Sequence, residues 1–290
     1  MIKKGIILAG GHGTRMSPLT KAVNKQLLPI YDKPLIYYPL SILMLAGIKD
    51  ILIIVNKGQL NQFEKILQNG KRFGVKISYL EQNYPKGLPD AFILGEKFIG
   101  KNNIALILGD NFFYGQSLTK KLKECIKLKS GCKILVHPVN RPELYGVAQI
   151  NNSKKIISIK EKPKKTKSNL AITGLYFFDN KVINLSKKLK PSKRNELEIV
   201  DLLNEYRKKN KLHAEYLGRG GAWLDTGSID DFYNTSSFVS SLENRQGLKI
   251  ACLEEIAANY NWISNKDIKK AISFYGNCPY ANYLKKISDQ

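Results

Sequence analysis

The sequence feature that most constrains this chain is a glycine-rich loop that directly follows its first apolar run. The stretch reads Ile6-Ile-Leu-Ala-Gly-Gly-His-Gly-Thr-Arg15, and Lys25-Gln26 follow ten positions after the arginine. Glycines leave backbone N–H groups free to approach an anion, and nearby cations can hold phosphate oxygens. The pattern therefore favours a phosphate-binding loop after a buried strand over an ordinary strand-to-helix turn.

Two familiar phosphate-binding loops do not fit these residues. A Walker A loop requires Gly-Lys-Ser/Thr, whereas this loop ends in Gly13-Thr-Arg15. The dinucleotide fingerprint requires a third glycine where this chain has Met16. Taken with Lys25-Gln-Leu-Leu-Pro29, the loop instead resembles the signature of the sugar-1-phosphate nucleotidylyltransferases.

Length and composition are those of a globular protein. With 290 residues, 43% of them hydrophobic, the chain can bury a large core in one α/β domain, with or without an appendage. Apolar runs such as Ile51–Val55 are far shorter than the roughly 18–20 residues that span a bilayer. The four cysteines and three histidines show no metal-site spacing. We expect a cytoplasmic protein with reduced thiols and no membrane insertion.

The net charge of +23 does not by itself indicate a nucleic-acid partner. Only seven of the 47 cationic residues are arginines, and the lysine runs lack interleaved aromatic residues. Proteins that read nucleic acids specifically favour arginine and aromatic stacking. The charge therefore predicts a solvated, lysine-rich surface and no specific nucleic-acid binding.

Strand-like and helix-like segments alternate through the first two thirds of the chain. This order predicts an open, largely parallel sheet covered on both faces, with ligands beyond the carboxyl ends of its strands. The expected strands are Gly5–Ala9, Ile51–Val55, Lys76–Glu81, Ile104–Leu108, Lys133–Val139, Gly146–Ile150 and Ala171–Phe178. The expected helices between them are Pro34–Ala46, Gln59–Leu67 and Leu88–Phe98.

The pattern changes after about residue 140. Strands joined by short loops are expected across 145–178, followed by a helix at Glu198–Lys209 and a strand at Leu212–Leu217. From Ser228 onward the chain looks helical, with no internal repeat.

Two aspartates are candidates for holding a divalent cation. Asp110 follows an expected strand in Leu108-Gly-Asp110, and Asp225 stands in Trp223-Leu-Asp225-Thr-Gly227. Two carboxylates together with substrate phosphates suit Mg²⁺, which prefers octahedral oxygen ligands. An aspartate at a strand end is by itself more often a cap, so the interpretation depends on the whole set.

Further segments suit a sugar-phosphate pocket. Glu161 can accept hydrogen bonds from two sugar hydroxyls, and Lys162 can neutralise the phosphate. Tyr145 and Trp223 offer flat apolar faces for a pyranose ring, although core aromatics are an equal alternative.

In order and spacing, these segments resemble the glucose-1-phosphate thymidylyltransferases over nearly the whole chain. Further matching stretches are Tyr31–Leu40, Leu45–Ile48, Leu170–Phe178, Glu196–Ile199 and Arg245–Lys249. The resemblance implies a Rossmann-like nucleotidyltransferase fold with a mixed, mostly parallel sheet, a small sugar-binding β subregion and a C-terminal helical extension. It also implies a homotetramer that needs Mg²⁺ and makes dTDP-glucose from dTTP and glucose 1-phosphate. We expect an α/β domain over 1–227, with a nucleotide part to about 140 and a sugar-phosphate part from about 141, and a helical extension over 228–290.

The resemblance also implies roles for individual residues. The catalytic residues would be Arg15, Lys25 and Lys162, and the metal ligands Asp110 and Asp225. The nucleotide would be bound by Leu8, Gly10, Gly11, Gly13, Thr14, Arg15, Gln26, Gln82, Gly87 and Asp110. The sugar phosphate would be bound by Asn111, Tyr145, Gly146, Glu161, Lys162, Thr173 and Trp223. A second, feedback-inhibitory site for a nucleotide sugar such as dTDP-rhamnose would use Tyr114, Gly115, Arg219, Arg245, Lys249 and Glu255, for which a solvated surface or a subunit contact is the alternative.

The main departure from the family is Gly87-Leu-Pro89-Asp90-Ala91, where Gly-Leu-Ala-Gln-Ala is usual. Pro89 fits the first turn of a helix and Asp90 its positive end, and altered base or sugar preference is the alternative. Asn24 replaces a serine, and His12 fills a variable loop position. Transfer from UTP, transfer to another hexose phosphate, and a non-catalytic nucleotide-sugar sensor are kept as alternative functions.

Overall fold

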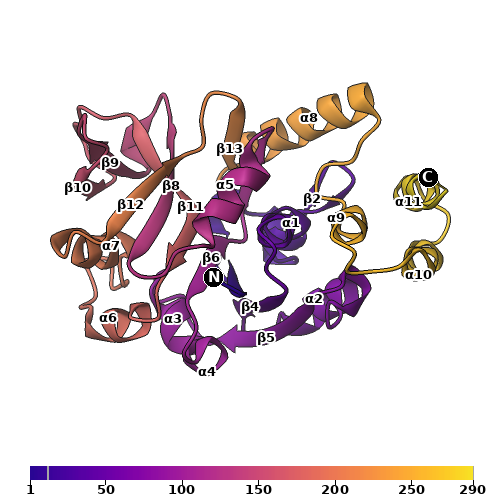
Figure 1. The fold of residues 1–290 in the computed structure, drawn as a ribbon, viewed down its shortest axis with the longest axis horizontal. Helices are drawn as coiled ribbons and strands as arrows, with labels where there is room; N and C mark the ends of the chain where they lie inside the picture. Colours follow the sequence, from indigo (N-terminus) through magenta and orange to yellow (C-terminus); the bar gives the residue numbers. More distant parts are fainter. Residues whose placement is uncertain (12, 290) are drawn as a thin grey trace.

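A nine-stranded mixed sheet forms the centre of the fold in the computed structural model, which describes residues 1–11 and 13–289 and so leaves His12 outside the described residues (Figure 1). One half of the sheet is parallel, in the order β6-β1-β4-β5. These strands are β1 (Lys4–Ala9), β4 (Asp50–Asn56), β5 (Lys76–Gln82) and β6 (Ile104–Leu108). Their carboxyl ends lie at one edge, because Ala9 pairs with Val55 and Asn56 pairs with Gln82.

The other half of the sheet is mostly antiparallel. Strand β11 (Leu170–Phe178) runs antiparallel to β6, and its other partners are β8 (Cys132–Pro138) and β9 (Gly146–Ile150). Strand β10 (Ile156–Glu161) pairs with β9, and β12 (Leu212–Tyr216) runs parallel to β8. The predicted α/β class and mixed central sheet are therefore confirmed, with the change of direction at β11.

Helices cover both faces of the sheet. Alternate residues of a strand point to opposite faces, so Ile6 and Ile7 of β1 belong to two separate apolar cores. The core on the Ile7 side is completed by α1 (Tyr37–Leu45), α2 (Leu60–Leu67), α5 (Leu118–Cys125) and α9 (Leu253–Asn259). The core on the Ile6 side is completed by α3 (Asp90–Leu94), α4 (Glu96–Ile99), α6 (Val182–Lys188) and α7 (Ile199–Lys208).

A separate two-stranded ribbon lies next to α8. It consists of β7 (Asn111–Gly115) and β13 (Gly221–Asp225), and it packs on α8 (Ile229–Gln246) through an edge-to-face contact between Tyr114 and Phe238. A shorter ribbon is formed by β2 (Pro29–Ile30) and β3 (Lys33–Pro34). Short 3₁₀ turns lie at Thr14–Met16, Leu19–Lys21, Lys25–Leu27, Lys71–Phe73 and Pro142–Leu144.

The described chain after Ser228 is helical, as the sequence predicted. The Ser228 side chain accepts a hydrogen bond from the Asp231 N–H and so caps α8. Helices α10 (Asn265–Tyr275) and α11 (Pro279–Ser288) lie together at the C-terminal end (Figure 1). None of the helices in residues 1–11 and 13–289 combines the length and apolarity that a bilayer span requires.

The structure differs from the sequence prediction in several places. The β7–β13 ribbon was not predicted, since its strands lie about a hundred residues apart in the chain. The helix expected over Leu88–Phe98 is divided at Gly95, where a Cβ would lie 2.9 Å from the Ala91 carbonyl oxygen. The helix expected from Pro34 begins at Tyr37, because Pro34 belongs to β3. Pro89 and Asp90 do lie at the start of α3, as expected.

Candidate active site

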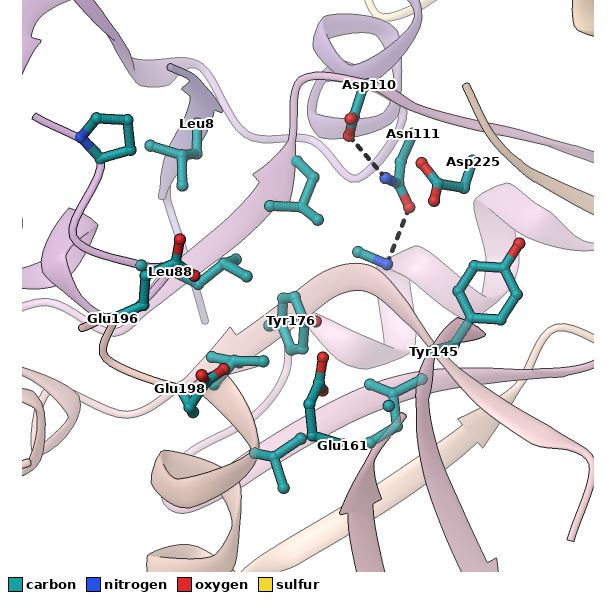
Figure 2. Close-up of a pocket in the computed structure, with 18 of the residues that line it drawn as sticks. Leu8, Leu88, Asp110, Asn111, Tyr145, Glu161, Tyr176, Glu196, Glu198 and Asp225 are labelled. Atoms are coloured by element: carbon teal, nitrogen blue, oxygen red, sulfur yellow. Dashed lines mark hydrogen bonds between the residues drawn. The ribbon is translucent and has the colours of Figure 1, made fainter. Parts of the chain in front are cut away.

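The carboxyl edge of the parallel strands opens into a cavity of about 370 Å³ (Figure 2). The glycine loop, the end of β5 and the β6–β7 connection form one side, and β9, β10 and the segment before α7 form the other. The predicted site residues that line it are Leu8, Gly10, Arg15, Gln26, Gln82, Gly87, Asp110, Asn111, Tyr145, Gly146, Glu161, Lys162, Trp223 and Asp225.

Some predicted residues support this cavity without lining it. Gly13 has φ +57, which favours glycine, and its carbonyl accepts a hydrogen bond from the Thr20 hydroxyl at 2.8 Å. Thr14 is the first residue of the 3₁₀ turn that carries Arg15. Gly11 is held by Asn56 through two hydrogen bonds.

The position of the Thr173 side chain does not fit the prediction that this residue binds the sugar phosphate. Its side chain is fully buried, and its hydroxyl donates to the Leu135 carbonyl at 3.1 Å. Since side chains alternate along a strand, the neighbours Ile172 and Gly174 line the cavity instead.

A partly buried ion pair fixes the first of the two aspartates. Lys25 Nζ lies 2.7 Å from Asp110 Oδ2, and the lysine side chain is only 7% exposed. The Asn111 amide also donates to Asp110 Oδ1, at 3.1 Å. Burial alone would raise the pKa of Asp110, but the charge and hydrogen bond of Lys25 hold the pKa below its usual value. Asp110 is therefore a carboxylate at neutral pH.

The second aspartate lies next to the first without a lysine of its own. In the β7–β13 ribbon Asp225 pairs with Asn111, and Thr226 donates to the Asp110 carbonyl through both its N–H (3.1 Å) and its hydroxyl (2.8 Å). Figure 2 shows Asp110 and Asp225 on either side of Asn111. Burial, followed by the negative charge of Asp110, raises the pKa of Asp225 to about 7.

These two carboxylates fit a divalent cation. Their mutual repulsion is relieved when a positive ion lies between them, and both offer the hard oxygen ligands that Mg²⁺ prefers. No cluster of three or more potential metal-ligating side chains occurs in the described part of the chain. The remaining ligands of such an ion would therefore be water or substrate oxygens.

Arg15 reaches the same place from the glycine loop. Its guanidinium lies against Gly227, where a Cβ would be 2.9 Å from Nη2, and its charge opposes the raised pKa of Asp225. Arg15 is exposed, so a ligand can reach it. Residues 15, 25, 110 and 225 are thus brought together from four separate segments.

Asn111 organises the wall between the two aspartates and the part of the cavity lined by Tyr145 and Trp223. Its side-chain oxygen accepts from the Trp223 indole N–H at 2.6 Å and from the Gly174 N–H at 3.0 Å. Trp223 in turn contacts Tyr145 edge to face, with ring centroids 5.1 Å apart. Both rings line the cavity, and the buried Asn111 amide fixes the Trp223 ring.

At the opposite end of the cavity, Glu161 is the last residue of β10 and Lys162 follows it. Gly146 pairs with Glu161, and a Cβ at Gly146 would lie 3.3 Å from Glu161 Oε2. Lys162 has φ +41, an uncommon value for a residue other than glycine, and its N–H donates to the Tyr145 carbonyl at 3.0 Å. This backbone conformation allows both Glu161 and Lys162, which are consecutive residues, to line the cavity.

Comparison with known proteins identifies the family. The Nucleotidyl transferase family model matches residues 4–241. A glucose-1-phosphate thymidylyltransferase of Neisseria meningitidis is 49% identical over 98% of this chain and 99% of its own length, and one of Mycolicibacterium smegmatis is 45% identical over 99% of each. The chain belongs to the glucose-1-phosphate thymidylyltransferase family. Like those relatives it is a nucleotidyltransferase, which the sequence predicted.

The nucleotidyltransferase fold is also shared with a more distant solved structure. A UDP-glucose pyrophosphorylase complexed with UDP-glucose superimposes with a TM-score of 0.73 at 28% identity, covering 83% of this chain and all of that chain.

Sequence reasoning missed some residues that line this cavity. Arg194 lines the cavity, with Nη2 2.7 Å from Glu198 and 3.7 Å from Glu161. Tyr176 and Glu198 line it as well. Arg194 is one of only seven arginines and lies two residues before Glu196–Ile199, a signal that could have drawn attention to it.

The six residues of the expected regulatory site do not line this cavity. Tyr114 and Gly115 lie on β7, and Arg219 and Arg245 are exposed. Lys249 pairs with Asp32 and Glu243, and Glu255 accepts from the Tyr283 hydroxyl at 2.8 Å. Their role in feedback stays a prediction.

The raised pKa of Asp225 predicts a pH-dependent stability. A folded-state pKa of about 7 against 3.8 in the unfolded chain means that the folded state binds the proton more tightly, so stability falls as pH rises from about 4 to 7. Asp225→Asn removes this penalty. We expect the metal-free variant to melt above the wild type at pH 8, by about 2–4 °C for each kcal/mol relieved, and level with it near pH 4.

Differential scanning calorimetry in EDTA across pH 4–8 measures this difference. Asp230→Asn, an exposed change in α8, is the matched control and should follow the wild-type curve. An Asp225→Asn protein that melts below the wild type at pH 8 would contradict the assigned repulsion.

Proposed function

We propose that this chain transfers a thymidylyl group from dTTP to glucose 1-phosphate, forming dTDP-glucose and pyrophosphate. The observation that carries the proposal is the convergence of Arg15, Asp110 and Asp225 at one end of a cavity whose other end holds Glu161 and Lys162. The names of the relatives that match nearly the whole chain support the same activity.

The reaction needs positioning and charge stabilisation more than acid–base catalysis. A phosphate oxygen of glucose 1-phosphate attacks the α-phosphorus of dTTP in line, and the bond to pyrophosphate breaks. The attacking oxygen is already an anion, so no strong base is required. The barrier comes from bringing two anions together and from charge that grows on the leaving pyrophosphate.

Different cationic residues stabilise the different phosphate groups. Arg15, beside the glycine loop, holds the leaving pyrophosphate, while Lys162 and Arg194 at the other end hold the sugar phosphate. Lys25 is paired with Asp110 at 2.7 Å, so its first effect is to keep that carboxylate charged. Mg²⁺ bound by Asp110 and Asp225 would supply positive charge to the phosphates of dTTP.

Separate groups of residues bind the base and the sugar. Gln26 and Gln82, which are both buried and line the cavity, form hydrogen bonds to the base next to the glycine loop. Glu161 accepts hydrogen bonds from sugar hydroxyls, and the paired rings of Tyr145 and Trp223 form the wall beside the pyranose.

A panel of nucleotides tests the proposal against its alternatives. We expect pyrophosphate release with glucose 1-phosphate to be fastest with dTTP and to require Mg²⁺, measured by a coupled phosphate assay with dTTP, UTP, CTP, GTP and ATP. A preference for UTP would make the chain a uridylyltransferase. If no pyrophosphate is released with any of the five nucleotides, the non-catalytic sensor is favoured.

Arg15→Ala tests the leaving-group role. We expect turnover to fall by about two to three orders of magnitude, the usual loss when one charge-stabilising group is removed from a transition state. The thermal midpoint should change little, because Arg15 is exposed. Lys266→Ala, which removes an exposed cation from α10, should keep wild-type turnover in the same assay. Near-normal turnover of Arg15→Ala would refute the assigned role.

We also propose that the chain is a homotetramer inhibited by dTDP-rhamnose at a second site that includes Arg219 and Arg245. Both side chains are exposed, so a nucleotide sugar can reach them. We expect inhibition that Arg219→Ala weakens by about tenfold or more while uninhibited turnover is unchanged. Titration of dTDP-rhamnose against turnover measures it, and no inhibition at millimolar concentration would contradict the site.

A further inference from the structure

Asn56, the last residue of β4, links the glycine loop to a glutamine that lines the cavity. Its Oδ1 accepts from the Gly11 N–H at 3.1 Å and from Gln82 Nε2 at 3.0 Å. Its Nδ2 donates to the Gly11 carbonyl at 2.9 Å. The contact follows from strand register, because Asn56 and Gln82 are paired residues at the ends of adjacent parallel strands.

These bonds determine which way each amide points. A backbone N–H can only donate and a backbone carbonyl can only accept, so the two bonds to Gly11 fix the Asn56 oxygen and nitrogen. Gln82 then has to turn its NH₂ towards Asn56 Oδ1, since the reverse orientation would bring two oxygens together. Gln82 Oε1 accepts from no side chain or backbone group in the described part of the chain and remains available to a ligand.

Packing holds the same arrangement in place. Gln82 is 4% exposed, and a Cβ at Gly10 would lie 1.9 Å from Gln82 Nε2. Gly11 has φ +151, which a side chain rarely allows, so the loop takes the shape that receives Asn56. An unlocked glutamine could rotate its amide and serve either a donor or an acceptor, whereas this one is held in a single orientation.

We propose that Asn56 is a positioning residue for base selection, acting through Gln82, so that bases with an N–H at ring position 3 are preferred over cytosine. This inference rests on the proposed function. Thymine and uracil present a donor at N3, which Gln82 Oε1 can accept, whereas cytosine presents an acceptor there and meets a second acceptor. A buried site of this kind discriminates strongly, because the wrong base leaves polar groups unpaired.

Binding of dUTP and dCTP tests the proposal directly, because the two bases differ only at N3 and at the neighbouring substituent on C4. Calorimetric titration with Mg²⁺ and without sugar phosphate gives both dissociation constants. We expect wild type to prefer dUTP. Asn56→Ser should reduce that preference about five- to tenfold, the usual effect of losing a neutral hydrogen bond such as the one that orients Gln82. Asn61→Ser, an exposed change in α2, should leave the ratio unchanged.

Two further variants separate positioning from a general loss of structure. Asn56→Asp keeps an oxygen facing Gln82 but loses the donor to Gly11, so it should weaken both nucleotides while retaining the ratio. In a Gln82→Ala background, Asn56→Ser should change the ratio no further. An unchanged ratio in folded Asn56→Ser, or an additive effect in the double variant, would overturn the inference.

The same titrations distinguish failure of this inference from failure of the proposed function. Wild-type protein that binds dTTP and dUTP but shows no preference over dCTP would overturn the role of Asn56 alone. Wild-type protein that binds none of these pyrimidine nucleotides would overturn both.

Discussion

The candidate active site depends on two neighbouring carboxylates with unequal partners. Lys25 pairs with Asp110 at the cavity wall, while the half-buried Asp225 lies beside Asp110 without a hydrogen-bonded cation among the described residues. Two negative charges in a low-dielectric site destabilise the empty protein, and a cation or an adjacent guanidinium relieves them. The fold therefore keeps an unfavourable interaction at the place where the proposed function needs positive charge and anionic substrates, a common exchange of stability for function.

The backbone supplies the rigidity that this arrangement requires. Four parallel strands end at one edge, which places the glycine loop, Asn56 and the Asp110 turn within reach of each other. The β7–β13 ribbon then carries Asp225 back to that edge, with Asn111 tying the ribbon to β11 and to Trp223. A catalytic arrangement held by strand ends and buried amides is more precise than one placed on mobile loops.

The sequence located most of the cavity because its signals are local. Glycines within a few residues of Arg15 indicate an anion site by backbone chemistry alone, and β-strand runs of apolar residues identify the sheet. The sequence could not place Thr173, since a shift of one residue in strand register decides which face its side chain occupies. The sequence also could not show that Arg194 lines the cavity, because its position depends on ion pairs with Glu198 and Glu161.

What the sequence determined by itself was the family, the alternation of strands and helices, and the chemical groups available for phosphate and sugar. These follow from residue types and their spacing along the chain. Tertiary structure alone decided the partners: Lys25 with Asp110, Asp225 opposite Asn111, and Asn56 between Gly11 and Gln82. Charge states and amide orientations depend on atoms a few ångströms away in space but dozens of residues away in the chain, so only the folded structure determines them.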